Sequence, residues 1–227
     1  MATLMYKKLA AKCIEIAYEL FQLLKTKHFY IGFAALISGI QLNFFSQTYL
    51  HNYISEGKTL PVLSDLILDH LPYWDIDYLY DIFSLVSIGL FSLYIIHTRE
   101  YKKIPYFLLL CGFFHIVRGV FIVLTPFGNP PMFDGTEGLF NGFSKYELGV
   151  YPSGHTGIAY MYFILAKNYW YRTALLISVL IIIAALFLSR GHYSIDILSG
   201  IFFAYAIKAY GEKYILQFFI KQNQTTA

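Results

Sequence analysis

The sequence is poor in charged residues and in cysteine. Charged side chains make up 14% of its 227 residues, whereas a soluble domain carries about 25%. Hydrophobic residues make up 57%, and the mean hydropathy is +0.53. This composition excludes an ordinary soluble domain and indicates a membrane protein. The two cysteines, Cys13 and Cys111, lie far apart in the chain, so neither a disulfide framework nor a thiolate metal site is predicted.

Six apolar segments are long enough to be candidates for membrane-spanning helices. An α-helix rises 1.5 Å per residue, so about 20 apolar residues cross a hydrocarbon core roughly 30 Å thick. We therefore predict an all-α, polytopic membrane protein with six transmembrane helices. The predicted spans are 29–46, 78–97, 104–124, 155–170, 173–189 and 193–209.

The first 28 residues differ from these spans, because apolar side chains are mixed with lysine and glutamate at roughly helical spacing. This pattern predicts an N-terminal amphipathic helix on the cytoplasmic membrane interface. A helix packed on the underside of the bundle fits the pattern equally well. We expect no cleavable signal peptide here. The predicted organisation is an arm over 1–28, one six-helix membrane domain over 29–210 and a tail over 211–227.

Basic residues alternate with acidic ones along the loops. Lysine and arginine gather in the N-terminal arm, in the 98–105 loop and in the tail, whereas the 47–77 loop carries five acidic residues against Lys58. The positive-inside rule then places both termini in the cytoplasm. The 126–151 loop, rich in glycine and proline, falls on the extracytoplasmic side. Because loops this long are usually functional, we interpret it as a cap over the outer mouth of a site.

The first polar motif is Pro152-Ser153-Gly154-His155-Thr156. Ser153 is predicted to cap a helix, and Gly154 lets a ligand approach the backbone closely. The free N–H groups and the positive dipole end of such a helix start favour an anion. His155 can there bind a phosphate oxygen or protonate a leaving group. The alternative is a capped helix whose histidine merely lies among the lipid headgroups.

The second polar motif runs from Ser189 to Asp196 and contains Arg190 and His192. His192 and Asp196 are four residues apart, so they share one face if both lie on a helix. A carboxylate fixes the tautomer of a neighbouring imidazole and stabilises its cationic form. Arg190 offers a planar fork of donors to phosphate. The alternative is a structural histidine–aspartate pair that anchors the helix end.

Two apolar runs, 156–171 and 172–188, separate the motifs. Each is about 25 Å long as a helix, so a descent followed by a return brings both histidines to the same membrane face. Arg118, near the outer end of the third predicted span, either joins this cluster or extends to the lipid headgroups. Histidines, arginine and aspartate at a lipid–water boundary suit phosphate chemistry on a lipid.

These motifs resemble those of the type 2 phosphatidic acid phosphatase (PAP2) superfamily. Its hallmarks include a Pro-Ser-Gly-His element and a later Ser-Arg and His-x-x-x-Asp element on a six-helix membrane core. A closer resemblance is to the sphingomyelin-synthase-like branch, and it covers roughly residues 104–209. The stretches that carry it are Ser153-Gly154-His155-Thr156, His192-Tyr193-Ser194-Ile195-Asp196, and Arg118 with Thr125-Pro126. Gly191 alone separates arginine from histidine here, which is shorter than in the phosphatases, and the Cys-Gly-Asp stretch of the transferases is not seen.

The resemblance implies a lipid phosphotransferase. It implies that His192 forms a phosphohistidine, that Asp196 orients His192, and that His155 protonates the departing oxygen. The residues implied to hold the phosphoryl oxygens are Arg118, Ser153, Gly154 and Arg190. No metal or cofactor is implied. The expected substrates are membrane phospholipids, with a diacylglycerol or ceramide-like lipid as the acceptor, and no nucleic acid is expected as a partner.

Other functions fit parts of the pattern. A PAP2-type lipid phosphate phosphatase would use the same residues but release the phosphoryl group to water. An intramembrane serine protease, with Ser153 as nucleophile and His192 as base, makes poor use of Arg190. A non-enzymatic lipid transporter or scramblase would place its polar residues near the middle of the membrane. A metal site of His155, His192 and Asp196 is disfavoured by the arginines beside it.

Overall fold

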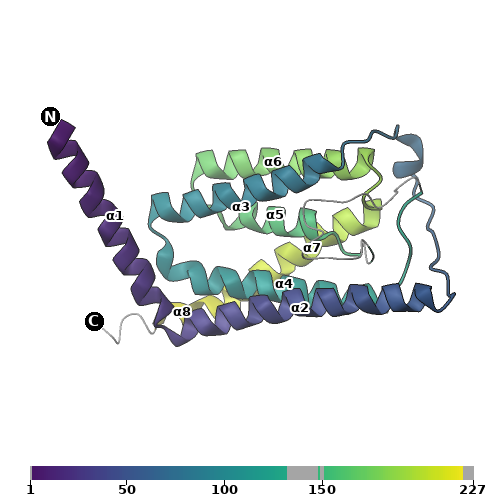
Figure 1. Cartoon of the computed structure of the whole chain (residues 1–227), viewed down its shortest axis with the longest axis horizontal. Helices are drawn as coiled ribbons and strands as arrows, with labels where there is room; N and C mark the ends of the chain where they lie inside the picture. Colours follow the sequence, from purple (N-terminus) through teal and green to yellow (C-terminus); the bar gives the residue numbers. More distant parts are fainter. Residues whose placement is uncertain (1, 132–147, 149–150, 222–227) are drawn as a thin grey trace.

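The computed structural model describes residues 2–131, 148 and 151–221, and this part of the chain is helical with no β-strand. Figure 1 shows a long bundle from which the N-terminal helix projects at an angle. The helices are α1 (Ala2–Leu24), α2 (Lys27–Ser55), α3 (Tyr78–Thr98), α4 (Ile104–Leu124), α5 (Gly154–Leu165), α6 (Tyr169–Leu188), α7 (Ser194–Tyr210) and α8 (Leu216–Lys221). Short turns of 3₁₀-helix at Leu68–His70 and Tyr101–Lys103 and a π-helix at Gly211–Ile215 complete the set.

Within the described residues, four segments are long and apolar enough to cross a membrane. They are Lys27–Ser55, Tyr78–Thr98, Tyr101–Leu124 and Tyr169–Leu188. The other two predicted spans correspond to α5, with 12 residues, and α7, with 17. At 1.5 Å per residue, α5 is about 18 Å long, less than the hydrocarbon core. The count of six spans therefore stays a prediction, as does the interfacial position of α1.

The fourth predicted span, 155–170, is wrong in its second part. The helix ends at Leu165, and the chain runs extended through Ala166 before α6 begins. Asn168 starts the new helix, because its side-chain oxygen accepts a hydrogen bond from the backbone N–H of Trp170 (3.1 Å). A polar cap inside an otherwise apolar run thus divides it into two helices.

Pairs of helices lie side by side in Figure 1: α3 lies along α6, and α2 along α4, with α5 and α7 between the pairs. The close approach of α2 and α4 depends on glycine. A Cβ atom on Gly39 would lie 2.5 Å from the carbonyl oxygen of Gly112, and one on Gly119 would lie 2.7 Å from Leu42. Small residues at a membrane helix interface allow this contact. Ser46 adds a hydrogen bond across the interface to the carbonyl of Gly119 (2.7 Å). This packing fixes the rotation of α4 and so the direction of its polar residues.

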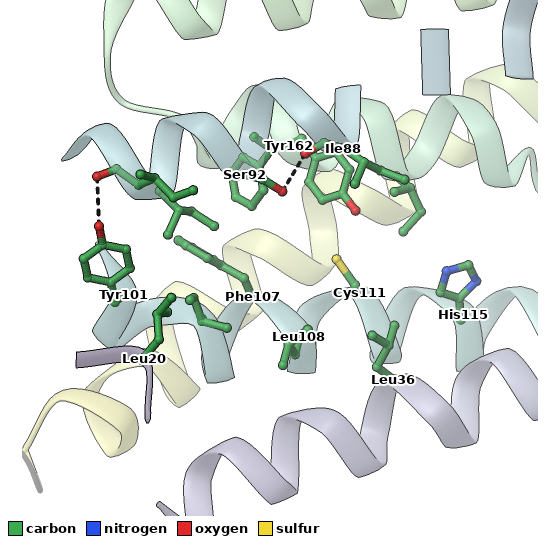
Figure 2. Close-up of a pocket in the computed structure, with 15 residues that line it drawn as sticks. Leu20, Leu36, Ile88, Ser92, Tyr101, Phe107, Leu108, Cys111, His115 and Tyr162 are labelled. Atoms are coloured by element: carbon green, nitrogen blue, oxygen red, sulfur yellow. Dashed lines mark hydrogen bonds between the residues drawn. The ribbon is translucent and has the colours of Figure 1, made fainter. Parts of the chain in front are cut away.

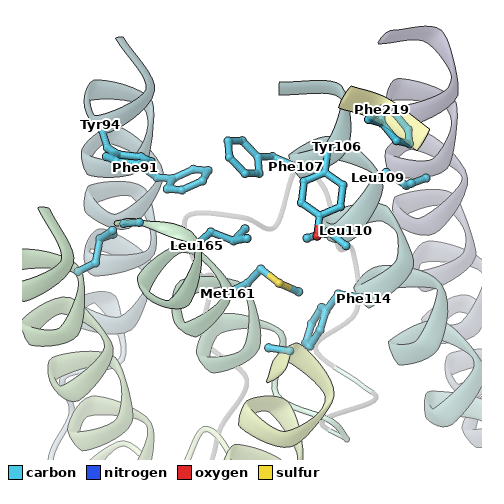
Figure 3. Close-up of a cluster of buried hydrophobic side chains, with 13 residues drawn as sticks. Phe91, Tyr94, Tyr106, Phe107, Leu109, Leu110, Phe114, Met161, Leu165 and Phe219 are labelled. Carbon is cyan, nitrogen blue, oxygen red and sulfur yellow. The ribbon is translucent and has the colours of Figure 1, made fainter. Parts of the chain in front are cut away.

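An aromatic core fills the half of the bundle away from the two polar motifs (Figure 3). Phe91 on α3 stacks on Tyr162 of α5 and meets Phe107 of α4 edge-on. Met161 and Phe114 are fully buried beside them. Apolar packing therefore holds one half of the bundle, and the polar residues described next lie in the other half.

Candidate active site

The two polar motifs meet at one end of the bundle, as predicted. The backbone N–H of Ser153 donates a hydrogen bond to the carbonyl of Asp196 (3.0 Å), which joins the start of α5 to the start of α7. Gly200 makes this possible, because a Cβ there would lie 2.7 Å from the carbonyl oxygen of Ser153. Ser153 and Asp196, which are 43 positions apart in sequence, are thereby placed in contact through their backbones.

His192 and Asp196 are in contact, but not because both lie on a helix. The helix begins at Ser194, and His192 lies in the turn before it. Asp196 is the third helical residue, and its Oδ2 accepts the backbone N–H of Tyr193 (2.8 Å) in a capping box. The same oxygen lies 3.3 Å from Nδ1 of His192. The cap thus holds the carboxylate against the imidazole and leaves Nε2 as the nitrogen directed away from it.

Both members of this pair are buried, and burial sets the protonation of the histidine. The side chain of His192 is 7% exposed and that of Asp196 is fully buried. Burial lowers the pKa of His192, because the low dielectric disfavours the cation, and Asp196 opposes the shift. His192 is therefore neutral near pH 7, the form in which a ring nitrogen can act as a nucleophile. The second oxygen of Asp196, Oδ1, is buried and has no hydrogen-bond partner among the described residues.

His155 also has a carboxylate partner, one that the sequence analysis missed. Its Nε2 lies 3.1 Å from Oδ1 of Asp81, which is on α3 and 74 positions away. The two histidine rings lie edge to face, with centroids 6.4 Å apart. A signal was present in the sequence: Asp81 is an ionisable residue inside a predicted apolar span, where such groups are usually functional. The contact of Asp81 with His155 could not be predicted from the sequence.

Arg118 lies against the start of α5, beneath the first motif. Its Nε donates to the carbonyl of Pro152 (3.0 Å), and its Nη1 donates to Oδ1 of Asn43 on α2 (2.7 Å). A Cβ on Gly154 would come within 3.1 Å of that Nε, so glycine permits the approach. Arg118 therefore contacts the first motif and belongs to the cluster. Asn43 is a second residue that the sequence analysis missed.

Arg190 lies at the C-terminus of α6 in a left-handed conformation, with φ of 59°. The N–H groups of Arg190 and Gly191 bond back to Phe187 and Leu186, which is the Schellman pattern that usually places glycine at this position. The guanidinium donates to the carbonyl of Leu71 (2.7 Å), and its buried Nε has no hydrogen-bond partner among the described residues. An arginine where the backbone favours glycine indicates that the side chain itself is needed.

Ser153 and Gly154 differ in what they offer a ligand. Ser153 is fully buried, its Oγ accepts the N–H of Thr156 (3.4 Å) and it lies 3.2 Å from the hydroxyl of Thr156. It is the predicted helix cap, and its hydroxyl is engaged inside the protein. Gly154 is the first residue of α5, at the positive end of the helix dipole.

Loops from two other parts of the chain meet the second motif. Tyr193 Oη accepts the N–H of Leu63 and donates to the carbonyl of Asn129, both at 3.1 Å. Asp65 accepts the hydroxyl of Ser194 (2.7 Å). These contacts hold the 61–71 segment over the start of α7. Most of the predicted 126–151 cap lies outside the described residues.

The cluster combines two histidine–carboxylate pairs and two arginines. One imidazole is buried and neutral, and the second is more exposed. Arg118 supplies positive charge near His192, and Arg190 lies in the turn that leads to His192. Such a set can bind a phosphoryl group, attack it and donate a proton to its leaving group. Among the described residues, no group of three or more histidine, cysteine, aspartate or glutamate side chains is placed to hold a metal ion. The chain matches no protein-family model and no curated protein.

Proposed function

We propose that the protein is a membrane lipid phosphotransferase that works through a phosphohistidine, similar to the sphingomyelin-synthase-like branch of the PAP2 superfamily. The observation that carries this proposal is the pair of neighbouring imidazoles, 6.4 Å apart between ring centroids, each with its own aspartate. His192 contacts its aspartate through Nδ1, whereas His155 contacts its aspartate through Nε2. A histidine with only a structural role needs no such second histidine beside it. Two differently placed imidazoles match the two roles of nucleophile and acid.

In the first step, Nε2 of His192 attacks phosphorus and forms a P–N bond. The ester bond between phosphorus and the lipid oxygen breaks, and His155 gives that oxygen a proton. Asp196 stabilises the positive charge that develops on the phosphorylated ring, because it accepts from the other ring nitrogen. Asp81 holds the ring of His155 in place through its contact with Nε2.

In the second step, a lipid hydroxyl attacks the phosphohistidine. His155 now accepts the proton of that hydroxyl, the P–N bond breaks, and the acceptor leaves as a phosphodiester. Arg118, Arg190 and the N–H groups at the start of α5 are the donors proposed for the phosphoryl oxygens. The buried Nε of Arg190, which has no hydrogen-bond partner in the part of the chain that the structure describes, supports its part in this set.

The competing functions make less use of these contacts. Ser153 caps α5 and is fully buried, so it is poorly placed to be a protease nucleophile. The polar cluster lies at one end of the bundle, whereas a transporter site is expected near the middle of the membrane. A phosphatase would share the first step and differ only in releasing the phosphoryl group to water.

The deciding experiment uses the purified protein with a phospholipid labelled in its headgroup phosphate, with and without diacylglycerol or ceramide. We expect an acid-labile phosphohistidine that His192→Ala removes, and a labelled phosphodiester that requires the acceptor lipid. Orthovanadate, which mimics five-coordinate phosphorus, should inhibit the reaction. Label released only as free phosphate or free phospho-headgroup, unaffected by either acceptor, would rule out the transferase and favour the phosphatase.

We also propose that the site faces away from the cytoplasm and that both termini are cytoplasmic, which rests on the lysine and arginine alternation. The test starts from a chain in which the exposed Cys13 is replaced by serine. An impermeant thiol reagent added to intact cells should label Lys58→Cys, which follows α2, and spare Lys102→Cys, which lies between α3 and α4. The opposite labelling would reverse the orientation.

A further inference from the structure

An apolar groove runs along the bundle below the candidate active site. Its volume is about 400 Å³, and it lies between α3, α4 and α5, with one residue of α2 and one of α1 at its edges. Figure 2 shows Phe107, Leu108 and Cys111 of α4 on one side and Ser92 of α3 on the other. The groove follows α4 from Ile104 to His115, which is about 16 Å along a helix.

Three helices each carry a site residue and groove residues on the same face. On α4, His115 lies three residues before Arg118, and Cys111 lies four residues before His115. On α5, Ile158 follows His155 by three positions. Residues at these spacings share a helix face. The groove is therefore a continuation of the active site toward the middle of the bundle.

Asp81 and the groove residues of α3 repeat this arrangement. Ile88 and Ser92 follow Asp81 by seven and eleven positions, again on one face. Ile88, Ser92 and Ile96 are nevertheless exposed, because α3 and α4 make few contacts with each other. The groove is thus open sideways, to the hydrocarbon that surrounds a membrane-spanning helix pair.

The two ends of the groove differ in polarity. At the end nearest the site, His115 lies one turn below Arg118, and its ring nitrogens can donate or accept a hydrogen bond. At the far end, Tyr101 closes the groove with a hydrogen bond from its hydroxyl to the carbonyl of Ile96 (3.1 Å). An occupant that fits these ends has a hydrogen-bonding group at one end of a hydrocarbon chain.

We propose that this groove binds one acyl chain of the phospholipid donor, with the ester region of that chain at His115. The inference rests on the proposed function, because it is the donor phosphate that places the lipid beneath Arg118 and His155. The oxygen that His155 protonates then belongs to the lipid held in the groove. Lipid tails are as apolar as the groove, so shape and length, not the hydrophobic effect, select the chain.

Photo-crosslinking tests the groove without relying on turnover. The full chain is reconstituted in lipid nanodiscs with a phospholipid that carries a diazirine near the end of one acyl chain, and the crosslinked peptides are mapped by mass spectrometry. We expect crosslinks concentrated on the groove residues of α3 and α4, several-fold above exposed apolar residues elsewhere such as Leu93 and Ile177. Uniform labelling of all exposed apolar residues would overturn the proposal. A ceramide-like probe that labels the groove while the phospholipid probe does not would overturn the assignment to the donor.

A matched pair of variants tests the effect on catalysis. Ser92→Trp fills the groove, whereas Leu93→Trp places the same side chain at the neighbouring exposed position of α3. Ser92→Trp should lower kcat/KM for a dioleoyl donor about tenfold and affect a dihexanoyl donor less, as overpacking excludes the longer chain. Leu93→Trp should match the wild type with both donors, and equal losses in the two variants would refute the groove. Groove crosslinks in a chain that transfers no phosphoryl group would retain the lipid site and refute the phosphotransferase.

Discussion

The two histidine–carboxylate pairs are built in opposite ways. His192 and Asp196 are four residues apart, and a single capping turn brings them together. His155 and Asp81 are 74 residues apart, and only the packing of α3 beside α5 makes them neighbours. The local pair is the more deeply buried, since the side chain of His192 is 7% exposed and that of His155 is 31% exposed.

This difference in burial suggests different tasks. A buried, neutral imidazole whose orientation is fixed within its own turn is suited to repeated attack on phosphorus. A more exposed imidazole held by a distant aspartate can exchange protons with a leaving group and with an incoming hydroxyl. The comparison therefore makes separate predictions for the two pairs.

The largest expected effect comes from removing the histidines. His192→Ala should lower kcat by about 10⁴-fold or more, because no other group in the cluster is placed to form the covalent intermediate. His155→Ala should cost about 10²- to 10⁴-fold with a phospholipid and much less with an activated ester whose leaving group needs no proton. Steady-state rates with both substrates check this. Equal sensitivity of the two variants to the leaving group would remove the distinction between the pairs.

The next effect concerns the carboxylate of the local pair. Asp196→Asn should lower kcat about 10³- to 10⁴-fold, because an amide neither fixes the required tautomer nor stabilises the imidazolium. Asp65→Asn is the control, since Asp65 also caps the start of α7 through Ser194 but does not contact His192. The control should reduce thermal stability and retain turnover. A comparable loss of turnover in both variants would mean that Asp196 acts only as a helix cap.

A smaller effect is expected from the distant carboxylate. Asp81→Asn should lower kcat about 10- to 100-fold, less than the loss of the acid itself, and mainly with poor leaving groups. Asp77→Asn, one turn earlier, is its control because Asp77 caps α3 through the N–H of Tyr78 (2.7 Å). A rate for Asp81→Asn equal to that of its control would show that the contact with His155 has no part in catalysis.

The smallest predicted effect is a shift of the pH profile. The lowered pKa of His192 places the acidic limb of kcat/KM below pH 6.5, the ordinary histidine value, because protonation removes the nucleophile. Asp196 raises this pKa, so Asp196→Asn should move the limb of the residual activity to still lower pH. The free energy of unfolding should also fall toward acidic pH. His192 is buried in its neutral form, so protonation of this histidine in the unfolded chain, as pH falls through 6.5, favours unfolding. A limb that moves upward in the variant would contradict this assignment.

The sequence determined the helices and the local polar contacts. The long apolar runs predicted α2, α3, α4 and α6, and the Ser153 cap and the contact between His192 and Asp196 were predicted from residues within four positions of each other. These features depend on helix period, length and capping, all of which are encoded by neighbouring residues. The early end of α5 was not predicted, because the apolar run continues past Leu165 and the break is marked by a single capping residue, Asn168.

Only the tertiary structure decided which distant side chains meet. Asp81 reaches His155, Asn43 reaches Arg118, and the groove opens between α3 and α4 because each helix has one particular rotation and depth in the bundle. That register is set by close packing, such as the approach of Gly39 to Gly112, and not by the period of any single helix. A helical sequence specifies which residues share a face, whereas the partner of that face depends on how all the helices fill space together.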